Sequence, residues 1–169
     1  MSKIHVEAID RSGEPILQSL LQLYTHDFSE HWAGTRKGDL NALGRFPDYP
    51  LESYWTDAGH SALLLRIENQ LAGFALLNRD GHSGRPVDAN IAEFFVVRKY
   101  RRGGVGTRFA HGLFKMRSGS WEAAVARKNV GALLFWRRVA QGYSGIADLE
   151  EVDVASPDWN GPVLRFRIH

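Results

Sequence analysis

The segment from Ile91 to Met116 constrains the fold of this chain more than any other. It begins with an apolar run, Ile91–Val97, which is typical of a buried strand, and continues into a basic turn with three glycines, Arg98–Gly106. Apolar residues then recur at helical spacing from Val105 to Met116, on one face of an expected helix. A strand that leads through a glycine turn into an amphipathic helix indicates an α/β fold.

The turn has the composition of an anion-binding site. The first N–H groups of a helix have no intrahelical partner and lie at the positive end of the helix dipole. Glycines before such a helix let the backbone approach a phosphate closely. Arg101, Arg102 and Thr107 add charge and a hydroxyl at the same place. A pyrophosphate suits this site, although a tight strand–helix connection with a basic solvent face has the same composition.

Two familiar nucleotide motifs do not match the turn. The P-loop is excluded because no Gly-Lys-Ser/Thr follows. The dinucleotide fingerprint is excluded because Phe109 stands where its third glycine belongs, and no βαβ unit opens the chain.

The rest of the chain reads as one domain, residues 1–169, without repeats or a linker. An irregular segment with a short helix, Trp32–Gly59, separates the first helix from a hairpin. The remaining expected elements are strand Ile4–Ile9, helix 14–28, strands Ser61–Ile67 and Leu71–Leu77, strand Trp121–Ala126, helix Asn129–Ala140, and closing strands Tyr143–Leu149 and Val163–Ile168. Antiparallel pairing in the first half and crossover helices in the second predict a mixed sheet.

Composition excludes several functional classes. A formal net charge of +2 is too small for a nucleic-acid binder, and the absence of cysteine excludes disulfides, thiolate metal sites and cysteine nucleophiles. His26 and His31 do not have the spacing of metal ligands on one helix face, so we expect no metal site. Neither a signal peptide nor a membrane-spanning run is expected, which predicts a cytoplasmic protein.

Several motifs in the second half resemble those of the GCN5-related N-acetyltransferases (GNAT). Arg101–Gly106 matches the Gln/Arg-x-x-Gly-x-Gly/Ala motif of that family, and Glu93–Val97 resembles its fourth strand. Asn129, Ala132 and Phe135-Trp136 resemble its Asn-x-x-Ala-x-x-aromatic helix, Gln141–Tyr143 its turn into the sixth strand, and Leu71–Phe74 its third strand. The resemblance implies a mixed, mostly antiparallel sheet of about seven strands, splayed between the fourth and fifth and flanked by helices.

The resemblance also implies acetyl-CoA as the cosubstrate, wedged into the splayed sheet. Backbone groups of Phe95, Val96 and Val97 are expected to bind the pantetheine like an added strand. Asn129 is expected to touch the pantetheine arm, and Phe135 and Trp136 to line its path. The residues expected around the pyrophosphate are Arg101, Arg102, Gly103, Gly104, Val105, Gly106 and Thr107.

For catalysis, acyl transfer to an amine needs a base for the amine and a proton for the departing thiolate. Glu93 is the candidate base, because strand alternation places it on the face of Phe95 and Val97; it could equally pair with a basic neighbour or line the substrate pocket. The family commonly has a tyrosine acid where this chain has Trp136, which cannot serve as one. Tyr143 or a water molecule is the expected substitute.

The acceptor amine is expected to bind along the first helix and the segment after it. Asp27 and Glu30 could receive a cationic amine, with Tyr24 or Trp32 stacked on it. The alternative is that Tyr24 belongs to the core and that the carboxylates are simply solvated.

These features predict an N-acetyltransferase that moves an acetyl group from acetyl-CoA to a primary amine of a small molecule or protein by direct attack. No nucleophile elbow is present, so no covalent enzyme intermediate is expected. Two alternatives are an acyl-CoA-binding sensor with little turnover and a nucleotide-binding α/β protein. The resemblance allows a homodimer through the sheet edge or the C-terminal strands; no membrane or nucleic-acid partner is expected.

Overall fold

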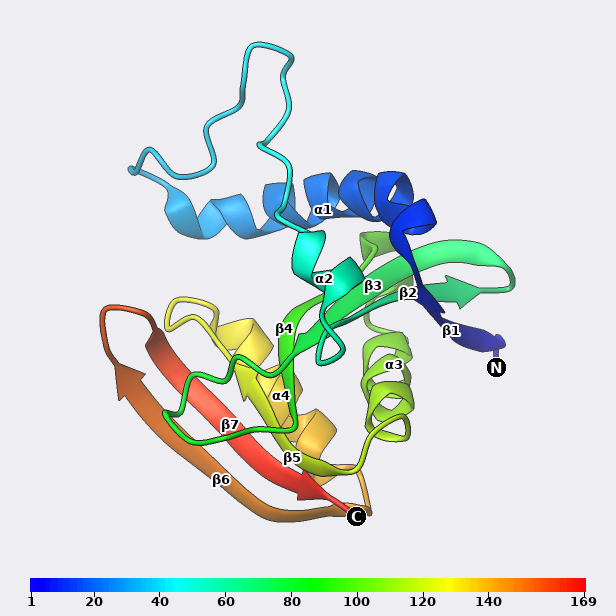
Figure 1. Ribbon diagram of the computed structural model, residues 1–169, viewed down its shortest axis with the longest axis vertical. Helices are drawn as coiled ribbons and strands as arrows, with labels where there is room; N and C mark the ends of the chain where they lie inside the picture. Colours follow the sequence, from blue (N-terminus) through cyan, green and yellow to red (C-terminus); the bar gives the residue numbers. More distant parts are fainter.

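The computed structural model describes all 169 residues and contains one seven-stranded sheet of order β1-β2-β3-β4-β5-β7-β6 (Figure 1). Helices α3 and α4 pack on one face of the sheet, and α1 and α2 pack on the other. No helix combines the length and apolar character needed to cross a bilayer. The elements are β1 (Ile4–Ile9), α1 (Glu14–Phe28), α2 (Glu52–Thr56), β2 (Ser61–Ile67), β3 (Gln70–Asn78), β4 (Ala89–Val96), α3 (Val105–Phe114), β5 (Gly119–Ala124), α4 (Val130–Gln141), β6 (Ile146–Ala155) and β7 (Asn160–Ile168).

The sheet consists of two antiparallel halves, β1 to β4 and β5-β7-β6, joined by one short parallel contact. Strands β4 and β5 pair only where Ala89 meets Trp121 and Asn90 meets Glu122. Beyond this contact the two strands separate. The expected mixed sheet, splayed between its fourth and fifth strands, is therefore confirmed.

A β-bulge in β4 accounts for the separation. Leu76 of β3 pairs with Glu93, whereas the next residue, Leu77, pairs with Ile91, so that Ala92 is the extra residue of β4. A bulge bends its strand and increases the local twist. Strand β4 therefore follows β3 past the bulge and leaves β5.

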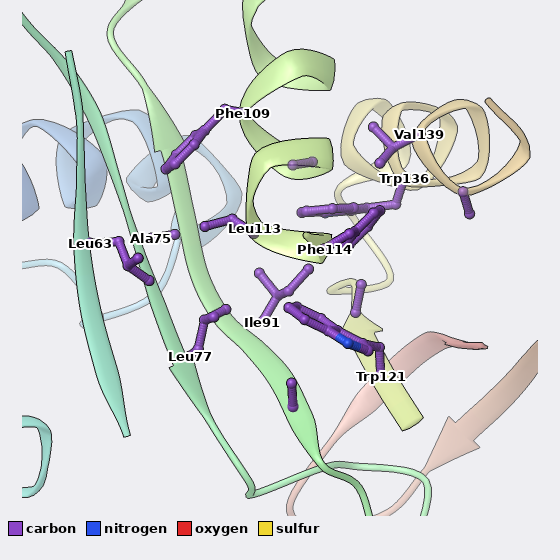
Figure 2. Packing of buried hydrophobic residues seen from close by; sticks show 14 of the residues in the cluster. Leu63, Ala75, Leu77, Ile91, Phe109, Leu113, Phe114, Trp121, Trp136 and Val139 are labelled. Carbon is purple, nitrogen blue, oxygen red and sulfur yellow. The ribbon is translucent and has the colours of Figure 1, made fainter. Parts of the chain in front are cut away.

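Two hydrophobic clusters hold the helices against the sheet. The larger lies under α3 and α4; Figure 2 shows side chains of the first sheet half meeting Phe109, Leu113 and Trp136. The smaller lies under α1 and α2 and includes Leu17 and Phe74. Fully burying a Leu or Phe side chain contributes about 1.5–3 kcal/mol, so both clusters fix the helices firmly on the sheet.

The elements predicted from the sequence differ from the observed ones at two places where the side chains are exposed. The helix after the glycine turn ends at Phe114, and Met116 is 52% exposed, so its predicted place on the buried face is wrong. The closing strand predicted at Tyr143–Leu149 is in fact β6, which begins at Ile146 and continues to Ala155. Strand β6 lies at the sheet edge with mostly exposed side chains, so its second half carries no apolar pattern.

Candidate functional site

A cavity of about 730 Å³ lies where β4 has separated from β5. Four parts of the chain contribute to it: the end of α1 with the residues just after it, strand β4, the turn into α3 with its first residues, and helix α4 with its N-cap. Its lining residues are Tyr24, Asp27, Phe28, Glu30, His31, Phe94, Phe95, Val96, Arg98, Arg101, Arg102, Gly104, Gly106, Thr107, Asn129, Gly131, Ala132, Phe135, Trp136 and Arg138. Most of the residues predicted from the sequence are thus brought together.

The glycine turn leaves the N-terminus of α3 open. Arg102 and Gly104 both adopt left-handed backbone conformations, with φ of 67° and 76°, and these reverse the chain just before the helix. Gly104 is the N-cap and offers no side chain to the first turn. The N–H groups of Val105, Gly106 and Thr107 therefore have no intrahelical partner, as an anion site requires.

Two arginines on the cavity wall are unpaired, one in the turn before α3 and one on α4. Arg102 and Arg138 line the cavity, and neither makes an ion pair. The guanidinium of Arg102 in the turn before the open helix N-terminus, together with that of Arg138 on the wall, gives the cavity a positive potential.

The free edge of β4 forms the wall of the cavity. The N–H of Val97 donates to the carbonyl of Ala72 at 2.8 Å, so the backbone of Val97 faces β3. Because an antiparallel strand alternates its hydrogen-bonding sides, Phe95 also faces β3, and the backbone groups of Phe94 and Val96 face the gap. Of the three residues predicted to offer backbone groups, only Val96 does so, and Val97 does not line the cavity.

Arg101 spans the cavity instead of joining the helix end. Its Nε donates to the carbonyl of Val96 at 2.7 Å, its guanidinium pairs with Asp27, and it lies 5.4 Å from the centre of the Phe95 ring. The sequence prediction that Arg101 adds charge at the phosphate turn is therefore wrong for its side chain in this structure.

Asp27 is already neutralised by two arginines. Besides Arg101, Arg98 donates to it through Nε at 2.9 Å. Partial burial raises the pKa of Asp27, but the hydrogen bonds from Arg101 and Arg98 outweigh this and hold the pKa below its usual value. The prediction that Asp27 receives a cationic amine is not supported by this geometry; Asp27 fastens the end of α1 to the turn.

Glu93 lies behind the cavity rather than on its wall. Its Oε1 accepts from the hydroxyl of Tyr49 at 3.0 Å, and its Oε2 accepts from the hydroxyl of Tyr24. Burial raises the pKa of Glu93, and the bonds from Tyr24 and Tyr49 offset part of that rise. Its expected position on the face of Phe95 is confirmed, but Glu93 pairs with no basic neighbour.

Helix α4 closes the far side. Asn129 caps it, since its Oδ1 accepts from the N–H of Ala132 at 3.1 Å. Phe135 and Trp136 line the cavity and pack against Phe94, the first tilted at a centroid distance of 5.7 Å and the second edge-on at 5.0 Å. A Cβ on Gly106 would lie 3.1 Å from the Phe135 ring, so glycine there allows α3 and α4 to approach closely.

Besides Glu93 and Val97, four further predicted site residues do not line the cavity. Tyr143 packs against His111 and Phe114, at centroid distances of 5.0 and 5.3 Å, and cannot reach a reacting group there. The prediction that Tyr143 serves as the general acid is therefore not supported by its position. Trp32 packs against Phe28 at 5.3 Å rather than facing the cavity. The other two, Gly103 and Val105, are part of the turn but do not line the cavity.

Several lining or supporting residues were not predicted from the sequence. Phe28 and His31 lie next to the predicted acceptor residues, and Arg138 belongs to the basic pair Arg137-Arg138, whose charge suits an anionic ligand, but none of the three was assigned to the site. Tyr49 lies in an irregular segment, where no periodicity links it to Glu93, so no sequence pattern could have found it.

The sequence profile of the acetyltransferase (GNAT) family matches residues 17–142 of the chain. No curated protein sequence matches. Among solved structures, the aminoglycoside acetyltransferase AAC(6')-Ib in complex with coenzyme A and kanamycin is similar, with a TM-score of 0.64 and 12% identity over 98% of this chain and 94% of that one. A GNAT-family acetyltransferase from Staphylococcus aureus Mu50 gives a TM-score of 0.61 and 13% identity over 99% and 100% of the two chains. A chimera of the spermidine N-acetyltransferases of Vibrio cholerae and hSSAT gives 0.59 and 12% over 99% and 95%.

Proposed function

Because the chain belongs to the acetyltransferase (GNAT) family, we propose that it transfers an acetyl group from acetyl-CoA to a primary amine. The observation that carries this proposal is the open N-terminus of α3, preceded by unpaired Arg102, in a cavity along the free edge of β4 whose wall also carries unpaired Arg138. Acetyl-CoA supplies the activated acetyl thioester.

The cavity suits coenzyme A in two respects. The free N–H groups at the start of α3, with Arg102 and Thr107, match a pyrophosphate. The backbone of Phe94 and Val96 offers hydrogen bonds to an extended amide chain. Arg101 already donates to the carbonyl of Val96, so an amide chain bound there shares this oxygen with the guanidinium or displaces it.

The catalytic group that we propose is Glu93. Its raised pKa makes the Glu93 carboxylate a stronger base than a solvated glutamate, and no other carboxylate perturbs it. Trp136 is buried and its indole is no acid, and Tyr143 is remote. The thiol sulfur therefore leaves as a thiolate and takes its proton from solvent.

The acceptor binds, in this proposal, at the α1 end of the cavity. Tyr24, Phe28 and His31 provide an aromatic wall there, and Glu30 is its one carboxylate outside an arginine pair. Similar structures include enzymes for spermidine and for aminoglycosides, so both classes of amine belong in a first screen.

A thiol-release assay tests the proposal. Purified protein is incubated with acetyl-CoA and spermidine, kanamycin, propylamine or a peptide with a free N-terminus, and liberated CoA thiol is followed together with the mass of the amine. Acetylation of one or more amines, abolished by Glu93→Gln, supports the proposal. Binding of acetyl-CoA without transfer to any amine would instead favour a sensor of acyl-CoA.

A further inference from the structure

The proposed base has no direct access to the cavity. Glu93 is absent from the lining of the cavity, whereas Tyr24 of α1 belongs to that lining and its hydroxyl donates a hydrogen bond to Glu93. A proton that leaves an amine in the cavity therefore meets Tyr24 before Glu93.

Hydroxyl groups hold both oxygens of the carboxylate. Tyr24 bonds Oε2, and Tyr49, from the segment before α2, bonds Oε1 at 3.0 Å. Tyr54 of α2 is the third ionisable group facing Glu93. No cation pairs with the carboxylate and no second acid contacts it, so its pKa is set by burial, which raises it, and by the bonds from Tyr24 and Tyr49, which offset part of that rise.

Packing fixes the orientation of Tyr24. Its ring lies edge-on to Phe74 at 5.7 Å and to Phe95 at 6.0 Å, and it is tilted against Phe28 at 6.0 Å. Burial and the nearby negative charge of Glu93 raise the pKa of Tyr24 well above its usual value. The phenol thus stays protonated and keeps its bond to Glu93.

We propose that Tyr24 is a catalytic residue that relays the proton of the acceptor amine to Glu93. This inference rests on the proposed acetyl transfer. The amine nitrogen forms a bond to the acetyl carbon, the carbon–sulfur bond breaks, and the sulfur leaves with the bonding pair. The proton lost by nitrogen passes to the oxygen of Tyr24 while the proton of Tyr24 passes to Glu93. Reversal of the relay returns that proton to solvent once the products have left.

Tyr49 provides a matched control. Tyr24→Phe and Tyr49→Phe each remove one hydroxyl from Glu93, yet only Tyr24 lines the cavity. We expect Tyr24→Phe to lower kcat by roughly a hundredfold or more, the range of general acid–base catalysis, with KM for acetyl-CoA unchanged within about twofold. Tyr49→Phe should lower kcat by less than about tenfold and move the acid limb of the pH profile to higher pH, because a bond that lowers the pKa of Glu93 is lost.

The pH profile and a second nucleophile distinguish a proton relay through Tyr24 from a purely structural role of this residue. In the wild type, kcat should fall as the pH drops through the raised pKa of Glu93; in Tyr24→Phe this acid limb should disappear. Hydroxylamine, which is largely unprotonated at neutral pH, should lose much less rate in Tyr24→Phe than propylamine does. CoA titration verifies that each variant is folded and binds.

Equal losses in the two variants, or a Tyr24→Phe kcat within about threefold of wild type, would overturn the relay while leaving the acetyltransferase activity intact. A wild-type protein that binds acetyl-CoA but acetylates no amine overturns the proposed function and the relay with it.

Discussion

A negative charge introduced at Gly104 should weaken anion binding without affecting the fold. Gly104 has φ of 76°, and no atom lies within 4 Å of the position its Cβ would take. Asparagine therefore fits sterically and costs only the left-handed backbone conformation, about 1–2 kcal/mol. Aspartate has nearly the same size and backbone cost but places a carboxylate at the open end of α3.

The difference between the two variants gives the electrostatic effect. Unit charges about 4 Å apart repel by about 4 kcal/mol at an effective dielectric constant of about 20. Arg102 screens part of this, so we expect Gly104→Asp to raise the Kd for CoA by roughly a hundred- to a thousandfold relative to Gly104→Asn. Both variants should show similar melting temperatures without ligand, a few degrees below wild type.

Isothermal titration with CoA at low and high salt measures the effect. The loss in Gly104→Asp should shrink at high salt, because exposed charges are screened. A Gly104→Asp variant that is folded and binds CoA within about twofold of Gly104→Asn would refute the placement of the pyrophosphate at α3.

Three further changes test the fold around the site by thermal and urea denaturation. Asp27→Asn should lower the free energy of unfolding by about 1 kcal/mol at neutral pH, because the arginine pairs are lost. The pKa of Asp27 is lowered in the folded state, so the difference between the two proteins should vanish as the pH falls through that pKa. A loss that does not depend on pH would argue against the pairs. Glu122→Gln should cost about 3–5 kcal/mol, since Glu122 is fully buried and pairs with Arg165 at 2.5 Å; a cost below about 1 kcal/mol would contradict a buried pair. Leu113→Ala should cost about 2–5 kcal/mol as a fully buried α3 residue, and a neutral effect would show that α3 is not held by this core.

Local patterns predicted the fold well. Helix α1 has the predicted bounds, because its apolar residues repeat at helical spacing after Pro15. The hairpin between β2 and β3 was also recognised, and its turn residues Glu68 and Asn69 both have positive φ, as a tight two-residue turn requires. The family resemblance is confirmed by the profile match over residues 17–142.

Side-chain partners across long sequence distances were not predictable. Asp27 and Glu30 both read as carboxylates free to meet an amine, but the fold brings Arg98 and Arg101 onto Asp27. The bonds from Tyr24 and Tyr49 to Glu93 likewise join segments 69 and 44 residues apart. A pattern along one element indicates which face is buried, whereas such pairs depend on how elements meet in space.

The most direct test of the central claim is a thermal-shift titration with acetyl-CoA, CoA, NAD and ATP side by side. A ligand present at about 100 times its Kd should stabilise the native state by about 2.7 kcal/mol, which is about 5–10 °C for a chain of this size. The account predicts that acetyl-CoA and CoA raise the melting temperature by such an amount and that NAD and ATP do not. A folded protein that does not respond to the CoA species, or responds more strongly to NAD or ATP, would contradict it.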